Sequence, residues 1–267
     1  MKAYLSIIKI RFMLLLQYRV AAAAGVFTQL FFGFVRVMVF YAFYSAASSG
    51  QPISYAQTIT YVWIGQAMLG TLPWNGDSEI QDMIRSGNVA YELCRPMNIY
   101  NQWFSRAIAL RTAPVLLRAV PIFAITILCL PKKYAMGIPP SLGAGLAWAA
   151  ATLGAIMLSC SITNIMNIST LWTISGEGLA RLLPAVVTIL SGMIVPLPLF
   201  PDWLRKVLAI LPFSGLVDIP VRFYTGHIPY TMILPYLLNQ ILWTLILVAF
   251  GRWLLSRKMK SIVVQGG

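Results

Sequence analysis

The sequence predicts an all-α, polytopic membrane protein in which six helices cross the membrane. Of its 267 residues, 59% are hydrophobic and only 10% are charged, and the mean hydropathy is +0.77. A soluble domain carries about 25% charged residues, so this composition cannot cover a water-exposed surface. The apolar runs are also unbroken, as in "VLLRAVPIFAITILCL" at 115–130. They lack the alternation of membrane β-strands, which favours helices.

A membrane-spanning helix needs roughly 20 predominantly apolar residues, and six segments of the chain meet this requirement. The predicted spans are at about 20–45, 54–74, 107–130, 141–172, 179–200 and 230–254. The fourth segment is apolar for longer than one crossing needs, so it is expected to tilt, break or project into water. A single transmembrane domain is predicted to cover 1–267.

Positive charge is unevenly distributed between the two sides that these spans define. Twelve Lys and Arg residues flank the spans on the side of both termini, whereas five lie on the opposite side. Because Lys and Arg are retained on the cytoplasmic side of membrane proteins, both termini are predicted to be cytoplasmic. The same flanking cations account for the net charge of +13, so no nucleic-acid partner is expected.

Residues 1–19 precede the first span and form a separate predicted element. Lys2, Ser6 and Lys9 fall near one helical face, while Ile7 lies elsewhere. Such a helix can lie in the plane of the lipid headgroups, with its apolar side against the acyl chains. An N-terminal interfacial helix is therefore expected.

The segment 75–102, between the second and third spans, concentrates charge on the predicted cytoplasmic side. It holds four of the seven acidic residues, namely Asp77, Glu79, Asp82 and Glu92. Within it, "SEIQDMIRSGN" is predicted to form a short helix that Ser78 caps, with Gln81 in the capping-box position. Acidic side chains suit the positive N-terminal end of a helix, and Arg85 suits its C-terminal end.

The same short helix has an apolar face. Ile80, Met83 and Ile84 follow the i, i+3, i+4 spacing of an amphipathic helix, and Gly87 or Asn88 is expected to end it in a left-handed conformation. One interpretation is a solvated loop that merely joins two spans. The other, which we favour, is a docking surface for another protein at the inner membrane surface.

Three of the arginines inside predicted spans are not among the flanking cations, and a charge within the membrane is costly and by default indicates function. Arg111 and Arg118 are seven residues apart and share one helical face, and Arg36 lies deep in the first span. Arg111 is expected to snorkel to the headgroups, whereas Arg118 lies about 10 Å further into the membrane. Arg36 has Asp202 and Asp218 as candidate partners. Alternatively, Arg36 or Arg118 contacts a transported anionic molecule.

The fourth span carries a polar stripe at helical spacing, formed by Ser159, Thr163, Asn167 and Thr170. Small polar residues often hydrogen-bond one membrane helix to another, and this interpretation is favoured. The alternative is that Thr163 and Asn167 line a translocation path together with Arg36 and Arg118.

The segment 196–228 follows the fifth span on the predicted outer side. Pro196, Pro198 and Pro201 interrupt the apolar run, and 202–211 is predicted to form a short amphipathic helix. Irregular backbone at membrane depth is tolerated only where protein buries it or where it lines a cavity. We therefore expect a re-entrant helical hairpin that dips into the outer face.

Motifs of catalysis and of cofactor binding are missing from the sequence. The single histidine, His227, lies in a predicted outer loop, and the three cysteines fit neither a metal site nor a disulfide framework. The sequence has no GxxxxGK[ST] phosphate-binding loop and no HExxH or GxSxG motif. A non-catalytic protein without a metal or a cofactor of its own is therefore predicted.

Two stretches resemble the permease subunits of type-2 ABC exporters, and the resemblance extends over nearly the whole chain. "SGNVAYELCRPMNIY" at 86–100 is similar to a tract of a bacterial subgroup with two different permeases. "GMIVPLPLFPDWLRKVLAILPF" at 192–213 is similar to the family's proline-rich outer hairpin. The interfacial helix, the six spans and the short cytoplasmic helix are also similar to the family's arrangement.

This resemblance implies that the chain is the permease of an ATP-driven exporter in a bacterial plasma membrane. It would form the translocation path with a second permease, often a paralogue, and two separate ATPase subunits would hold ATP and Mg²⁺. By position, the ATPase-coupling residues would be Glu79, Asp82, Met83, Arg85, Glu92 and Arg95. The alternatives are an integral membrane lipid-modifying enzyme, which requires clustered catalytic side chains, and the energy-coupling subunit of an importer, which should carry long charged cytoplasmic helices.

Overall fold

Helices account for the regular structure in the computed structural model, which describes residues 2–47, 50–173 and 177–259. No strand occurs in these ranges, in agreement with the predicted all-α class. The α-helices are α1 (Lys2–Leu15), α2 (Arg19–Ala46), α3 (Tyr55–Ala67), α4 (Ser78–Arg85), α5 (Val89–Leu93), α6 (Ile99–Leu128), α7 (Leu142–Trp172), α8 (Glu177–Leu190), α9 (Asp202–Ile210), α10 (Asp218–Tyr224) and α11 (Ile233–Met259). Short 3-10 helices are η1 (Leu69–Thr71), η2 (Leu197–Leu199), η3 (Pro212–Gly215) and η4 (Tyr230–Met232).

Four of the described helices are long and apolar enough to cross a membrane, namely Arg19–Ala46, Ile99–Leu128, Leu142–Trp172 and Tyr230–Met259. They correspond to the first, third, fourth and sixth predicted spans. α6 begins before the predicted start at 107 because Asn98 caps it, with the Asn98 Oδ1 accepting a hydrogen bond from the Asn101 backbone N at 3.1 Å. The chain is therefore an integral membrane protein.

The second and fifth predicted spans are only partly helical. α3 has 13 residues and α8 has 14, which at 1.5 Å per residue makes each about 20 Å long, less than the ~30 Å hydrocarbon core. The predicted break at Pro196 comes too late: α8 already ends at Leu190, because Gly192 adopts a φ of +85° that glycine tolerates without steric cost. The count of six crossings stays a prediction.

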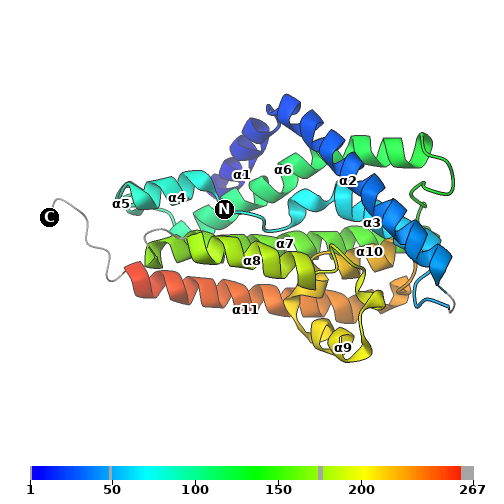
Figure 1. Cartoon of the computed structure of the whole chain (residues 1–267). Coiled ribbons are helices and arrows are strands. Elements are labelled where there is room, and N and C mark those ends of the chain that lie inside the picture. The colour runs from blue at the N-terminus through cyan, green and yellow to red at the C-terminus, as the bar shows by residue number, and fades with distance from the viewer. Residues whose placement is uncertain (1, 48–49, 174–176, 260–267) are drawn as a thin grey trace.

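The long helices extend between the two ends of the molecule, and α7 is central to them (Figure 1). α7 packs against α6, α10 and α11, and its buried small residues include Ala144, Ala151 and Ala155. Small side chains let membrane helices approach closely, which stabilises their packing. α1, α4 and α5 gather toward the end of the bundle where α11 terminates (Figure 1).

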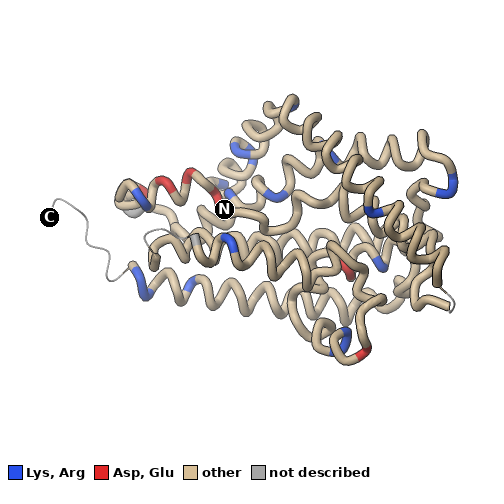
Figure 2. The backbone as a smooth tube through the Cα atoms, viewed as in Figure 1, with Lys and Arg blue, Asp and Glu red and all other residues tan. Residues whose placement is uncertain are grey.

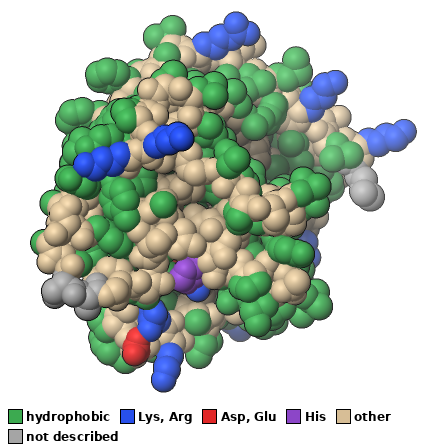
Figure 3. Space-filling model, turned by 90° about the vertical axis from the view of Figure 1, so that its right-hand side faces the viewer, with side chains coloured by type: hydrophobic (Ala, Val, Ile, Leu, Met, Phe, Trp, Pro, Cys, Tyr) green, Lys and Arg blue, Asp and Glu red, His purple; other side chains and the backbone are tan. Residues whose placement is uncertain are grey.

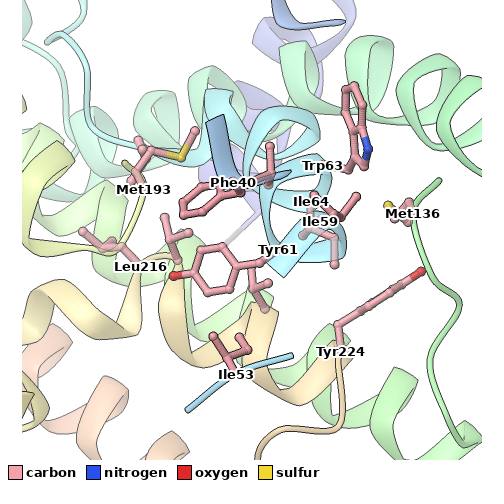
Figure 4. Packing of buried hydrophobic residues seen from close by; sticks show 14 of the residues in the cluster. Phe40, Ile53, Ile59, Tyr61, Trp63, Ile64, Met136, Met193, Leu216 and Tyr224 are labelled. Atoms are coloured by element: carbon pink, nitrogen blue, oxygen red, sulfur yellow. The ribbon is translucent and has the colours of Figure 1, made fainter. Parts of the chain in front are cut away.

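The main hydrophobic core surrounds α3. Tyr61 and Trp63 from this helix are buried, and they lie among side chains from other elements, such as Phe40 and Leu216 (Figure 4). Trp63 also donates a hydrogen bond from its Nε1 to the Tyr134 carbonyl oxygen at 2.8 Å. Every residue of α3 from Thr58 to Ala67 is buried, so the surrounding elements enclose this helix.

The proline-rich segment lies away from α4 and α5. Its predicted amphipathic helix over 202–211 is confirmed as α9, which ends at Ile210. Leu208 packs inward while Trp203 is exposed. Figure 3 shows the end of the molecule opposite α4. Hydrophobic side chains surround this face, and the histidine side chain is visible on it. The dip of this segment into the membrane stays a prediction.

Candidate functional site

The acidic residues of the predicted coupling segment gather at one end of the bundle, near α1 and the end of α11 (Figure 2). The short helix predicted over 78–86 is α4, and Gly87 follows it with φ of +76°, as expected. Its apolar face is also confirmed: Ile80 is fully buried, and Met83 and Ile84 pack beside it against α6 and α7. α4 is therefore docked on its own chain and presents its charged side outward.

The N-terminal end of α4 is capped by Asp77, which corrects the prediction of Ser78 as the cap. The Asp77 Oδ1 accepts hydrogen bonds from the backbone N of Glu79 at 3.1 Å and of Ile80 at 3.4 Å. Arg106 of α6 holds the same carboxylate from the other side, with its Nε 2.8 Å from Oδ2. A carboxylate fixed in this way is a strong acceptor for the helix end, which is why the cap falls one residue earlier.

Two arginines from different helices tie α4 to the bundle. The Arg106 Nη2 lies 3.0 Å from Asp77 Oδ1 and 3.0 Å from Glu79 Oε2, and Arg11 of α1 forms a two-point ion pair with Glu79. The Arg106 side chain is only 8% exposed, so salt screens its ion pairs less than those of a surface pair. The predicted coupling residue Glu79 therefore connects α1, α4 and α6.

The ion pairs of Glu79 give the docking of α4 a defined pH dependence. The hydrogen bond from Arg11, supported by Arg106, lowers the pKa of Glu79 to about 2. A carboxylate with a depressed folded pKa contributes stability above its unfolded pKa of about 4.3 and loses it as pH falls through the folded value. We expect the α1–α4 contact to persist from neutral pH to about 4.5 and to be lost between about 4.5 and 2.

Spin labels on the two helices measure this contact. They are placed at Ser6→Cys and Ser86→Cys after the exposed Cys94 and Cys129 are replaced by serine. The distance between the labels should increase only in the acid range. The Glu79→Gln variant, which has no charge to pair, should show the longer distance at every pH. Separation of the labels in the unsubstituted Glu79 protein above about pH 5 contradicts the assignment.

The remaining predicted coupling residues divide into outward and inward side chains. Asp82 is 73% exposed and Arg85 is 44% exposed, and they pair with each other at 3.5 Å. Arg95 is likewise exposed and pairs with Glu92 at 3.2 Å. Glu92 itself is buried, where the Gln102 Nε2 donates a hydrogen bond to it. Glu92 therefore positions the segment after α4, whereas Asp82, Arg85 and Arg95 are accessible to a partner.

The chain between α3 and α4 is not helical at 72–77. Arg111 of α6 donates hydrogen bonds to backbone carbonyls of this segment. The Arg111 Nη1 donates to the Leu72 carbonyl oxygen at 2.8 Å, and its Nη2 donates to the Asn75 carbonyl oxygen. Its Nε donates to Thr163 Oγ1 at 3.0 Å. The prediction that Arg111 snorkels to the headgroups is wrong, because the interrupted helix offers acceptors inside the protein. Irregular backbone at membrane depth needs such partners.

The polar stripe of α7 bonds the same interrupted segment. The Asn167 Oδ1 accepts a hydrogen bond from the backbone N of Asp77 at 2.8 Å, and Thr163, Ser159 and Thr170 are buried along the same helix. The contacts agree with the favoured interpretation of bonding between helices. Thr163 and Asn167 are both fully buried in this conformation, so their place in a translocation path stays a prediction.

Arg36 of α2 makes a similar contact at the second interrupted helix. Its Nη1 donates to the Met193 carbonyl oxygen at 2.7 Å, just beyond the end of α8. Asp202 and Asp218 instead pair with arginines three or four residues further along their own helices. The predicted pairing of Arg36 with one of these acids is therefore wrong. The backbone just beyond α8 is not helical, so the Met193 carbonyl needs a donor from another element, and Arg36 supplies it.

Arg118, the other arginine of the predicted path, is set apart from these contacts. It lies against Gly25 where α6 packs on α2. Its Nε is buried without a hydrogen-bond partner, and no described residue forms an ion pair with it. Among the three arginines, Arg36 and Arg111 bind backbone carbonyls, whereas Arg118 has no partner among the described residues.

A comparison with protein families shows to which family this membrane protein belongs. The family model described as ABC-2 family transporter protein matches residues 30–266. The chain belongs to the ABC-2 transporter family. It is accordingly a permease, the membrane component of an ABC transporter, which associates with ABC ATPase subunits and is generally non-catalytic. No curated protein matches the chain significantly.

In this ABC-2 permease, the sequence predicted the charged helix α4 but not the residues that hold α4 and α5. Arg11, Arg106 and Gln102 lie in other elements, and the only signal for them was charge or polarity complementary to the acidic patch. Within the described residues, no group of three or more His, Cys, Asp or Glu side chains is placed to hold a metal ion. The charged outer side of α4, with the exposed Asp82 and Arg85, stays a predicted surface for a protein partner.

Proposed function

We propose that this permease works in an ATP-driven exporter of a bacterial plasma membrane, with both termini in the cytoplasm. It forms the translocation path with a second, paralogous permease, while two ABC ATPase subunits bind ATP and Mg²⁺. The observation that carries the proposal is the charged outer side of α4, at an end of the bundle that is rich in Lys and Arg (Figure 2). By the positive-inside rule this end faces the cytoplasm, where the ATPases are.

α4 is positioned to pass movement of an ATPase to the membrane helices. Its outer side offers Asp82 and Arg85 to the partner. Its inner side is held by Arg106 of α6 and, through the backbone of Asp77, by Asn167 of α7. Shielded, charge-assisted hydrogen bonds are stronger than surface ion pairs. A push on the outer side is therefore expected to displace α6 and α7 rather than to detach α4.

The test is a triple variant, Asp82→Ala with Arg85→Ala and Arg95→Ala, in the complex purified with its ATPase. We expect the ATPase to bind about tenfold or more weakly and its stimulation by the permease to be lost, as for the loss of interface contacts worth at least 1.4 kcal/mol. Removal of the exposed Asp82–Arg85 pair should hardly change the unfolding temperature, because exposed ion pairs contribute about 0–1 kcal/mol. The buried Glu92 keeps its hydrogen bond from Gln102 when Arg95 is removed.

The matched control removes an exposed ion pair away from α4. Asp202→Ala with Arg205→Ala breaks the pair within α9, and it should leave ATPase binding and stimulation unchanged. Full ATPase stimulation and full export by the triple variant would show that the docking surface lies elsewhere.

A further inference from the structure

Two polar side chains, one on α6 and one on α2, contain buried atoms that have no hydrogen-bond partner within the described chain. Arg118 lies in the apolar part of α6, and its Nε is buried without a hydrogen-bond partner. Gln29 of α2 is only 3% exposed, and neither its Oε1 nor its Nε2 has a partner. Burying such groups unpaired is costly. Arg36 and Arg111, by contrast, both bond backbone carbonyls.

Gly25 of α2 shows where the Arg118 guanidinium lies relative to Gln29. A Cβ atom at Gly25 would lie 2.6 Å from the Arg118 Nε and 2.7 Å from its Cζ, so the guanidinium rests on the α2 backbone there. Gly25 and Gln29 are four residues apart, which puts them on one face of α2, about 6 Å from each other along the helix. The guanidinium and the amide therefore border the same small region between the two helices.

This region lies near the N-terminal end of α2. Gly25 is six residues beyond Arg19, the first residue of α2, which corresponds to about 9 Å along the helix. α1 and α2 meet in a corner just before Arg19 (Figure 1), and α1 is the predicted interfacial helix. A lipid headgroup at the level of this corner is within reach of a long arginine side chain, because such side chains extend toward the membrane surface.

The remaining surroundings are apolar. Val26 of α2 and Val115 of α6 pack in one hydrophobic cluster between the helices. Just outside it, Phe27, Leu116 and Val120 are large hydrophobic side chains exposed on the surface of the bundle. An occupant that matches the whole region therefore combines an anionic, hydrogen-bonding end with an apolar body.

We propose that Arg118 and Gln29 bind the headgroup phosphate of an anionic phospholipid from the membrane leaflet on the α1 side. The planar guanidinium donates two parallel hydrogen bonds to phosphate oxygens, a geometry that arginine favours. The Gln29 Nε2 donates a further hydrogen bond, and its Oε1 accepts one from a headgroup hydroxyl. The acyl chains lie along Phe27 and Leu116. This site goes beyond the proposed export function, because it binds lipid whatever molecule is exported.

The test measures lipid retention by the full-length protein in detergent, using native mass spectrometry. Phosphatidylglycerol and phosphatidylcholine are added in equal amounts, and the fraction of protein that carries each lipid is compared. We expect selective retention of phosphatidylglycerol, and we expect Arg118→Met or Gln29→Leu to reduce it about tenfold or more, the effect of losing a hydrogen bond to a charged group. Arg36→Met is the control and should retain the lipid fully, because Arg36 already bonds a carbonyl.

The unfolding temperature without lipid separates lipid binding from a structural role of Gln29. In lipid-free detergent, Gln29→Leu should unfold at the same or a higher temperature than the unsubstituted protein, because it removes an unpaired buried amide. A lower temperature indicates a partner within the chain and overturns the proposal.

Three retention results would also overturn it: unchanged retention by Arg118→Met, equal retention of both lipids, and displacement of the lipid by soluble glycerol phosphate, which indicates a site for free phosphate compounds. The assay needs neither an ATPase nor a transported substrate. Its outcome is therefore independent of the export proposal.

Discussion

Replacement of Arg111 by methionine is expected to destabilise this permease by about 3–5 kcal/mol, since each buried acceptor left without a donor costs about 1–3 kcal/mol. Arg111 donates to the carbonyl oxygens of Leu72 and Asn75 and to the Thr163 hydroxyl. The two carbonyls belong to non-helical backbone inside the bundle, where water does not replace the lost donor. The unfolding temperature should fall by roughly 10 °C for a chain of this size, as measured by thermal unfolding in lipid-free detergent.

Arg118→Met is the matched control for this measurement. It makes the same chemical change on the same face of α6, but Arg118 has no partner among the described residues. Its unfolding temperature in lipid-free detergent should therefore match that of the unsubstituted protein. Equal losses from the two variants would mean that the removal of any arginine from α6 lowers stability, and would contradict the specific role assigned to Arg111.

Replacement of Arg106 by methionine is expected to release α4 from α6 and to disconnect the ATPases from the membrane helices. Arg106 pairs with Asp77 at 2.8 Å and with Glu79 at 3.0 Å, and hydrogen bonds to charged groups contribute about 1.5–3 kcal/mol. A local loss of about 2 kcal/mol raises the hydrogen exchange of the α4 amides about 30-fold. Mass spectrometry of the exchanged peptide over 78–85 measures this, and the stimulated ATPase rate of the complex should fall in parallel.

The control for Arg106 is Arg205→Met, which breaks the exposed pair with Asp202 within α9. Exposed pairs contribute about 0–1 kcal/mol, so the exchange of α4 and the ATPase rate should both stay unchanged. Two results would count against the proposed transmission through α4. One is unchanged exchange of α4 in Arg106→Met, and the other is faster exchange with full ATPase stimulation.

The short helix α4 shows how far local sequence patterns extend. Its residues, its apolar face around Ile80 and its glycine stop at Gly87 were predictable, because each depends on neighbours within one or two helical turns. The cap was not, because Asp77 is held over the helix end by Arg106, 29 residues further along the chain. Local spacing cannot show which of two adjacent capping residues receives such a distant partner.

The partners of the intramembrane arginines were also not predictable from local patterns, because they lie even further away along the chain. The cost of these arginines in an apolar environment is enough to predict that each is either functional or paired. Two of them, Arg111 and Arg36, bind backbone carbonyls, which lie 39 residues away at Leu72 and 157 residues away at Met193. Every residue has a carbonyl, so the sequence carries no signal that distinguishes the acceptor.

The sequence alone therefore determined the membrane character of this permease, its long helices and the charged helix between the second and third predicted spans. These follow from composition and from the 3.6-residue period, which act over a few turns. Only the tertiary structure decided where α3 and α8 end, which arginines support the interrupted backbone, and which one has no partner among the described residues. A free carbonyl or an unpaired guanidinium exists only when the packing of distant helices has chosen the partners of all the others.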